Sequence, residues 1–377
     1  MMDKNKFKRI LFFTPYAGRT GSEMFLWYMF QNYDKSLFEI SLVSDCAGEL
    51  LPQMPKEVKT FISLKYPGVF GRLKKIAAKF IKINQYDLHL FKIHKKVNSD
   101  CWYLNTVLMT DKIKLAKRNN IKVITHFHEL TSDYGLVTKE QLQLAIDYSI
   151  LCIADSLAVY EKLKILGAKN VVLQYECIDI SKIKIDIDNS KRIKKELGLN
   201  SYSFIWLMSG TSSIRKGTDM VPELAKLLME QNAALVWLGN SSNSGMDLMI
   251  EKEVTAGNLE NVFFLGKKTN DYYDYMNIMD GFVLTSREEP FGMVVVEALA
   301  LGKPVVSFNA GGVSEIITPE IGRVIDSWNV RDLANTMKEV ASNNIGFDIE
   351  KAKAKAKHFD VSNQVGNWER ILFNLEL

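Results

Sequence analysis

The sequence has few of the residues that mark several protein classes. Its 377 residues include only 8 prolines and 22 glycines, too few for a collagen-like or low-complexity chain. Hydrophobic residues make up 47%, too many for a disordered chain. The four cysteines form no CxxC pair and stand in apolar surroundings. We therefore expect reduced, buried thiols in a cytoplasmic protein, and neither a disulfide framework nor a zinc site.

Long apolar segments are also missing. No run of 18 or more apolar residues occurs, so a membrane-spanning helix is not expected. The first nine residues are largely charged and lead into a short apolar run that stops at Pro15, which lacks the length and cleavage site of a signal peptide. The length itself predicts two or three domains.

Positive charge is concentrated in the first half of the chain. Residues 1–180 hold 26 Lys and Arg against 18 Asp and Glu, whereas residues 181–377 hold 22 against 26. Most of the excess lies in residues 65–96. Within them, the pattern of Arg72-Ile83 predicts a helix with lysines on one arc and apolar residues on the other. This helix is either an ordinary surface helix or one that binds an anionic membrane surface. The segment lacks interleaved aromatics and the other half is acidic, so we expect no nucleic acid partner.

Strands and helices alternate through both halves. Apolar strands are expected at residues 9–13, 39–43, 101–104, 122–125, 150–154 and 171–174, and then at 204–208, 234–238, 262–265, 281–284 and 304–308. This alternation is typical of α/β proteins with parallel sheets. It predicts two Rossmann-like, doubly wound domains that face a central cleft.

A polar stretch near residues 180–200 separates the two halves, as linkers often do. We expect domains at 1–185 and 186–360, followed by a terminal helix at 361–377. The stretch contains Asp186 and Asp188 in a D-x-D pattern. Such a pair holds a metal in some sugar-transferring enzymes, but no strand leads into this one, which favours a solvated linker.

The segment 281–317 carries the strongest functional signal. A predicted strand runs into Glu289-Pro290-Phe291-Gly292, and a helix is expected from Met293 to Leu301, capped by Gly302. Amides at Gly292, Met293 and Val294 would point at a phosphate, aided by the helix dipole. Glu289 and Glu297 could accept hydrogen bonds from sugar hydroxyls. The alternative makes them a solvated loop acid and a charge on a helix face.

These residues resemble a known family. Glu289 and Glu297, with Glu-Pro-Phe-Gly and Gly-Gly-Val-Ser-Glu around them, match the Glu-x7-Glu motif of the retaining glycosyltransferases of family 4, which have the GT-B fold. The resemblance implies that Glu289 contacts the donor sugar and Glu297 the ribose hydroxyls. It also implies that the loop of Pro290 and the amides of Phe291, Gly292, Met293 and Val294 line the sugar and diphosphate.

A second loop fits the same family. Gly210, Lys216 and Gly217 match its Gly-Arg-Leu-x-x-x-Lys-Gly pattern, but Thr211 replaces the arginine. We expect Lys216, with Arg215 as a second positive charge, to neutralise the departing diphosphate. The alternative is a basic turn before a helix.

Four residues in three other loops also follow from the resemblance. His128, at the end of a predicted strand, is expected to approach the donor sugar, although a strand-end histidine can also be a core residue. His126 and Glu129 extend the pattern to His-x-His-Glu, but no third ligand motif appears, so no metal is expected. Gly21 is expected to approach the ligand closely. Gly266 and Lys267 match a loop beside the nucleotide base.

The resemblance predicts a retaining, metal-independent glycosyltransferase that uses a nucleotide-sugar donor, with a UDP-sugar as the expected donor and no cofactor besides this co-substrate. The catalytic residues would be His128, Glu289, Lys216 and Arg215. The last helix is expected to cross back onto the first domain, where a glycan or lipid-linked acceptor of bacterial surface polysaccharide synthesis would bind. A peripheral position on the inner face of the cell membrane would follow. The alternatives are a nucleotide-sugar epimerase of the same fold and a catalytically silent nucleotide-sugar-binding protein.

Overall fold

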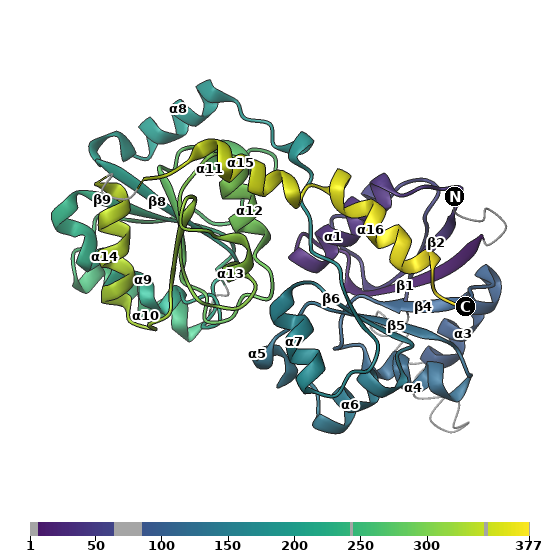
Figure 1. Cartoon of the computed structure of the whole chain (residues 1–377). Coiled ribbons are helices and arrows are strands. Elements are labelled where there is room, and N and C mark those ends of the chain that lie inside the picture. Colours follow the sequence, from purple (N-terminus) through teal and green to yellow (C-terminus); the bar gives the residue numbers. More distant parts are fainter. Residues whose placement is uncertain (1–6, 64–84, 242–243, 343–345, 377) are drawn as a thin grey trace. The chain divides into compact units, whose positions relative to one another are not determined.

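The computed structural model describes residues 7–63, 85–241, 244–342 and 346–376. The predicted membrane-binding helix at Arg72–Ile83 lies outside these residues and stays a prediction. The chain forms two compact units, one of residues 1–177 with 361–377 and one of residues 178–360 (Figure 1).

The first unit is built on a parallel sheet of seven strands in the order β3-β2-β1-β4-β5-β6-β7. The strands are β1 (Lys8–Tyr16), β2 (Phe38–Cys46), β3 (Lys59–Ile62), β4 (Cys101–Leu104), β5 (Val123–Phe127), β6 (Leu151–Ala154) and β7 (Val171–Leu173). The helices are α1 (Gly21–Asn32), α3 (Gln85–Val97), α4 (Thr110–Arg118), α5 (Thr131–Tyr134), α6 (Lys139–Tyr148), α7 (Leu157–Ile165) and α16 (Val361–Phe373). Strands β4, β5 and β6 are buried along their whole length, as expected when helices cover both faces of a parallel sheet.

The terminal helix α16 belongs to the first unit and packs beside α1 (Figure 1). Its Trp368 is fully buried against Phe12 of β1 and Phe38 of β2, with ring centroids 5.9 and 6.4 Å apart. The ammonium of Lys8 is buried and donates to the carbonyl oxygens of Leu372 and Phe373. A cation at the end of a helix satisfies carbonyls that have no partner within the helix. The terminal helix therefore returns to the first domain, as the resemblance implied.

The second unit repeats the plan with six parallel strands in the order β10-β9-β8-β11-β12-β13. These are β8 (Phe204–Ser209), β9 (Ala233–Leu238), β10 (Val262–Phe264), β11 (Gly281–Leu284), β12 (Val305–Phe308) and β13 (Gly322–Ile325). The helices are α8 (Ile187–Glu196), α9 (Val221–Leu228), α10 (Gly245–Ala256), α11 (Tyr272–Asn277), α12 (Met293–Ala300), α13 (Val313–Ile316), α14 (Val330–Ala341) and α15 (Ile349–His358). Figure 1 shows α9, α10 and α14 on one face of the sheet and α11, α12 and α15 on the other.

The first unit ends at Cys177, eight residues before the expected boundary at 185. The reason is that the intervening segment bonds to the second unit. The amide of Ile178 donates to the carbonyl oxygen of Phe359, and the amide of Asp186 donates to Asp274. Asp186 also accepts from two amides of the first turn and so caps α8. Asp186 and Asp188 are both exposed, as predicted for a solvated linker.

Both sheets share one topological feature. In each, the first strand (β1 or β8) lies between the second strand (β2 or β9) and the fourth (β4 or β11). The direction of winding reverses between the first and fourth strands, and ligands of such sheets bind outside the carboxyl ends of the strands at this point. Within the described residues, no helix is long and apolar enough to cross a membrane.

Candidate functional site

Two loops of the second unit meet at the reversal point of its sheet. One follows β8 and carries Arg215 and Lys216, and the other follows β11 and carries Ser286 and Glu289. Strands β8 and β11 are direct neighbours. The amide of Arg287 donates to the carbonyl oxygen of Arg215 at 2.7 Å, which ties the two loops together.

Lys216 and Glu289 form a buried ion pair between these loops. The Lys216 Nζ lies 2.5 Å from the Glu289 Oε2, and the two side chains are 15% and 9% exposed. The hydroxyl of Ser286 donates to the same oxygen at 2.9 Å. The backbone of Glu289 is fixed as well, because its amide donates to the carbonyl oxygen of Ala310 at 2.7 Å. The structure thus holds a carboxylate and an ammonium side by side where a ligand of this fold would bind.

The charge of Glu289 follows from these neighbours. Burial by itself raises the pKa of Glu289, but the charges of Lys216 and Arg215 and the hydrogen bonds from Lys216 and Ser286 outweigh it, so the pKa lies below its usual value. Glu289 is therefore a carboxylate at neutral pH, able only to accept hydrogen bonds. Arg215 is held by a bond of 3.0 Å from its Nη1 to the carbonyl oxygen of Glu288.

The loop after Glu289 turns sharply into α12. Gly292, at φ +104°, opens the helix, whose N-terminus has no side-chain cap. A Cβ on Gly312 would lie 2.0 Å from the carbonyl oxygen of Pro290, so only glycine lets these two backbones approach. Phe291 is buried and its ring packs 5.2 Å from Phe359. Its side chain is therefore part of the core, and a ligand could meet only its backbone.

Glu297 lies inside α12 and is bound by two tyrosines of α11. Tyr272 donates to its Oε2 at 3.0 Å and Tyr273 to its Oε1 at 2.9 Å. Burial raises the pKa of Glu297 to about 7, although the two phenol hydrogen bonds oppose the shift. The sequence did not single out the tyrosines. Adjacent tyrosines before a predicted strand were the available signal, but their contact depends on how α11 packs.

The other predicted residues of the second unit lie near the carboxyl ends of its strands. Gly210 follows β8 at φ +152°, and its carbonyl oxygen accepts a bond of 2.9 Å from the Trp237 indole. Gly266 follows β10 at φ +69° and its carbonyl oxygen accepts from the amide of Gly239 at 3.1 Å. Lys267 is exposed. Their predicted contacts with a nucleotide stay predictions.

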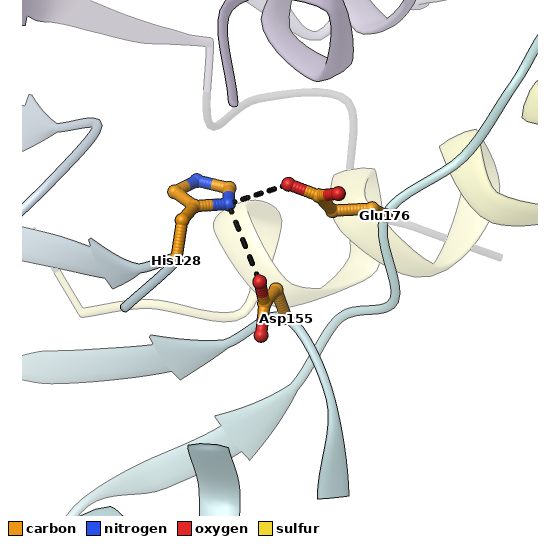
Figure 2. Close-up of side chains that lie close together, drawn as sticks. All are labelled: His128, Asp155 and Glu176. Atoms are coloured by element: carbon orange, nitrogen blue, oxygen red, sulfur yellow. Dashed lines mark hydrogen bonds and ion pairs between the residues drawn. The ribbon is translucent and has the colours of Figure 1, made fainter. Parts of the chain in front are cut away.

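The first unit has a cluster of its own at the same edge of its sheet. His128 follows β5, Asp155 follows β6 and Glu176 follows β7. The His128 Nδ1 lies 2.9 Å from Oε1 of Glu176 and 3.8 Å from Oδ2 of Asp155 (Figure 2). We call these three residues the His128 cluster. Their ligand-type atoms all lie within 4.8 Å of one another, close enough to hold a metal ion.

The groups around the His128 cluster differ in their charge states. Burial lowers the pKa of His128, but the hydrogen bond and the charge of Glu176, with the charges of Asp155 and Glu129, raise it above its usual value. Burial raises the pKa of Glu129 to about 7. His126 is bound to a different residue, since its Nδ1 lies 2.7 Å from the Tyr103 hydroxyl. Burial lowers the pKa of His126 far below the usual value. His126 is thus a neutral core residue.

Asp155 and Glu176 were missed from the sequence. Asp155 stands one residue and Glu176 two residues after a predicted strand, a place where polar residues of parallel sheets often meet, and this was the signal that could have found them. Gly21, which was expected to approach a ligand, is the first residue of α1. It stands two residues before Glu23, a buried carboxylate whose pKa is raised by burial.

Comparisons with known proteins agree on one family. The family described as "Glycosyl transferases group 1" matches residues 189–358. Among curated proteins, the chain is 26% identical to the N-acetyl-alpha-D-glucosaminyl L-malate synthase of Bacillus anthracis, over 69% of this chain and 68% of that protein. It is 30% identical to the lipopolysaccharide core biosynthesis mannosyltransferase LpsB of Rhizobium meliloti, over 45% of this chain and only 50% of that protein.

Solved structures share the fold over the whole chain. The structure of Anabaena HepE in complex with UDP-glucose aligns with 98% of this chain and 100% of that one, with a TM-score of 0.81 and 22% identity. The structure of WaaG, a glycosyltransferase involved in lipopolysaccharide biosynthesis, covers 97% and 100% with a TM-score of 0.71 and 15% identity. At these identities the likeness shows the GT-B fold of two Rossmann-like domains.

Proposed function

We propose that this chain, whose residues 189–358 form a domain of the glycosyl transferases group 1 family, transfers a sugar from a nucleoside diphosphate donor to a hydroxyl acceptor. The observation that carries the proposal is the buried pair of Lys216 and Glu289 at the reversal point of the second sheet. A donor sugar diphosphate offers both hydroxyls and concentrated negative charge, which match a carboxylate and an ammonium held side by side.

Lys216 and Arg215 would stabilise the diphosphate as it leaves. The Lys216 ammonium already donates to Glu289, and a diphosphate would give it a second, more highly charged acceptor. The first amides of α12 have no partners within the helix and would add hydrogen bonds to the same group. In many enzymes, most of the rate acceleration comes from stabilising the charge that develops in the transition state.

Glu289 and Glu297 would position the donor. Glu289 is ionised and buried, so it can accept from sugar hydroxyls without taking a proton from them. Glu297 would accept from the ribose hydroxyls in place of, or together with, the two tyrosine hydroxyls. Its predicted role requires the ionised form. Because burial places the pKa of Glu297 near 7, we expect the affinity for the donor to fall as the pH drops below about 7.

The stereochemistry would be retention of the anomeric configuration. A double displacement needs a carboxylate free to attack the sugar, whereas Glu289 is bound to Lys216 and Ser286. We therefore favour a reaction on one face of the sugar, in which the departing phosphate takes the proton of the acceptor hydroxyl. Such a reaction is driven by positioning and charge stabilisation. It requires no metal ion at the donor site and no cofactor besides the co-substrate.

The donor and acceptor classes are drawn from the relatives. The solved complex of HepE with UDP-glucose supports a UDP-sugar as donor. The named activity of the Rhizobium relative in lipopolysaccharide core biosynthesis supports a glycan or lipid-linked acceptor of bacterial surface glycan synthesis. We propose that the acceptor binds the first unit. We also propose that the protein is cytoplasmic and lies at the inner face of the cell membrane.

A thermal-shift panel of UDP, GDP, ADP and their common sugar conjugates tests the donor assignment. A ligand that binds only the folded protein stabilises it by about 2.7 kcal/mol at a hundredfold excess over its dissociation constant. We expect a shift with uridine nucleotides that is lost in Glu297→Ala. A shift with no nucleotide would contradict the proposal. Binding without turnover would favour the silent binding protein, and conversion of the donor sugar without an acceptor would favour the epimerase.

A further inference from the structure

We propose that Tyr272 and Tyr273 are positioning residues that hold both oxygens of Glu297 for the two hydroxyls of a ribose. They would thereby make the donor site selective for a ribonucleotide over a deoxyribonucleotide. This inference rests on the proposed function, since it concerns how the donor nucleotide is recognised.

The first support is the convergence of the two phenols. Tyr272 and Tyr273 are the first two residues of α11, and neighbouring residues of a helix point about 100° apart, so their side chains do not normally face each other. Here both hydroxyls nevertheless reach one carboxylate, Tyr272 at 3.0 Å from Oε2 and Tyr273 at 2.9 Å from Oε1 of Glu297. Each oxygen of Glu297 is therefore held by a phenol of its own.

The second support is the capacity of Glu297 for further donors. A carboxylate offers about four acceptor sites, and each phenol occupies one, so a site on each oxygen remains for a ligand. A ribose presents two adjacent hydroxyls, which match the two oxygens of one carboxylate as a pair of donors. The terminal torsion of a glutamate is broad. By binding both oxygens, the phenols fix this torsion and hold the carboxylate in one orientation.

The third support is the anchor of Tyr272. Its hydroxyl lies 3.1 Å from the Ser209 hydroxyl, and since the Tyr272 proton goes to Glu297, Ser209 is the donor in that contact. Ser209 is the last residue of β8, so this chain of hydrogen bonds begins at the reversal point of the sheet. The rings of Tyr272 and Tyr273 also pack edge to face with centroids 5.1 Å apart, an arrangement that aromatic pairs prefer.

The protonation of Glu297 gives an independent readout. Burial raises its pKa, and the hydrogen bonds from Tyr273 and Tyr272 oppose the rise. In the part of the chain that the structure describes, no charged side chain contributes to the shift. Removal of one phenol should therefore raise the pKa of Glu297 further. Because a ribose hydroxyl needs the ionised carboxylate as its acceptor, the variant should lose its preference for ribose at a higher pH than the wild type.

Calorimetric titration of the full chain with UDP and with 2′,3′-dideoxy-UDP tests the proposal. The two nucleotides share the base and the diphosphate and differ only in the ribose hydroxyls. The corresponding guanosine and adenosine pairs are titrated in parallel. At about pH 8, where Glu297 is mostly ionised, we expect the wild type to bind the ribonucleotide more tightly. The ratio of the two dissociation constants should fall at least about threefold in Tyr272→Phe and in Tyr273→Phe.

A matched control separates positioning from a general change in the fold. Tyr202→Phe removes a phenol that donates to the carbonyl oxygen of Glu260 at 2.9 Å, and it should keep the wild-type ratio. A general change in the fold would weaken both nucleotides of a pair equally and leave the ratio unchanged. A wild type that binds none of these nucleotides would refute the proposed function together with this inference. A wild type that binds one, with a ratio that Tyr272→Phe and Tyr273→Phe leave unchanged between about pH 6 and 8, would refute the positioning role alone.

A measurement on the unmutated protein covers the case in which a variant fails to fold. The chain has 14 tyrosines, and the NMR signal of the ring carbon that bears the hydroxyl responds to the hydrogen bonds of that hydroxyl. With this carbon labelled, we expect two tyrosine signals to shift with UDP and to shift less with 2′,3′-dideoxy-UDP. If every tyrosine signal responds alike to both nucleotides, the proposal is overturned.

Discussion

Removing the ammonium of Lys216 tests whether its pair with Glu289 holds the second unit together as well as binding the donor. Lys216→Met keeps most of the aliphatic stem and removes the charge. It leaves Glu289 buried, with Ser286 as its remaining side-chain hydrogen-bond donor. Breaking a buried ion pair by removing one partner costs about 3–5 kcal/mol. Since Lys216 is 15% exposed and the charge of Arg215 also acts on Glu289, we expect the lower end, about 3 kcal/mol.

The double variant separates the cost of an unpaired charge from the loss of function. Lys216→Met with Glu289→Gln leaves no buried charge, and the glutamine can still accept from Ser286. We expect the double variant to recover about 2 kcal/mol relative to the sum of the single effects. None of the three variants should transfer sugar, because each lacks at least one of the two groups. The double variant is expected to fold, so its loss of activity reports the missing groups and not unfolding.

Urea unfolding of the full chain measures these free energies. A matched control cycle uses Lys35→Met and Glu57→Gln, a pair of the first unit with Nζ and Oε1 2.6 Å apart but side chains 53% and 50% exposed. Exposed pairs couple by less than about 1 kcal/mol. The reasoning is refuted if the free energy of unfolding of Lys216→Met lies within about 0.5 kcal/mol of the wild-type value. It is also refuted if the double variant is no more stable than the less stable of the two single variants.

Three further predictions concern stability. Folding raises the pKa of Glu297 to about 7, so its protonated form stabilises the fold at low pH, and this stabilisation is lost as the pH rises through 7. Measured by urea unfolding, the stability of Glu297→Gln relative to the wild type should therefore rise by up to about 3 kcal/mol between pH 5 and 8. A pH-independent difference would contradict the assignment. Gly312→Ala, which meets the Pro290 oxygen, should destabilise the second unit by about 1–3 kcal/mol in calorimetry, whereas Gly245→Ala, which meets nothing, should not. Lys8→Met removes the donor to the α16 carbonyls and should speed hydrogen exchange in residues 361–376; unchanged exchange there would show that Trp368 packing alone holds the helix.

Much of the fold could be predicted because most strands are buried on both faces. Runs such as 281–284 and 101–104 are continuous apolar segments between turns, and the structure places β11 and β4 there. Two strands were missed, β3 and β13, and both lie at an edge of a sheet. An edge strand is short and half exposed, so its sequence carries polar residues, as in Lys59-Thr60-Phe61-Ile62. The other two edge strands, β7 and β10, were predicted because their residues are apolar.

The candidate site shows the same division between local and non-local information. The motif identified Glu289 and Lys216 separately, but their contact joins residues 73 positions apart. It exists because the sheet places β8 beside β11, with β9 and β10 on the far side. Tyr272 and Tyr273 at Glu297, and Asp155 and Glu176 at His128, are likewise set by packing between elements. Their positions after predicted strands, or side by side in the sequence, are signals, but no spacing along the chain indicates which residues they contact.

The anomeric configuration of a sugar released from its donor tests the transferase proposal most directly. The full chain is incubated with an α-linked UDP-sugar in water, which can replace the acceptor, and the first product is observed by proton NMR before it mutarotates. We predict release of UDP with the α-anomer, and loss of this reaction in the folded double variant Lys216→Met with Glu289→Gln. Release of the β-anomer would contradict retention. A donor that binds and stays intact, with water and with glycan or lipid-linked acceptors alike, would contradict the assignment as a transferase.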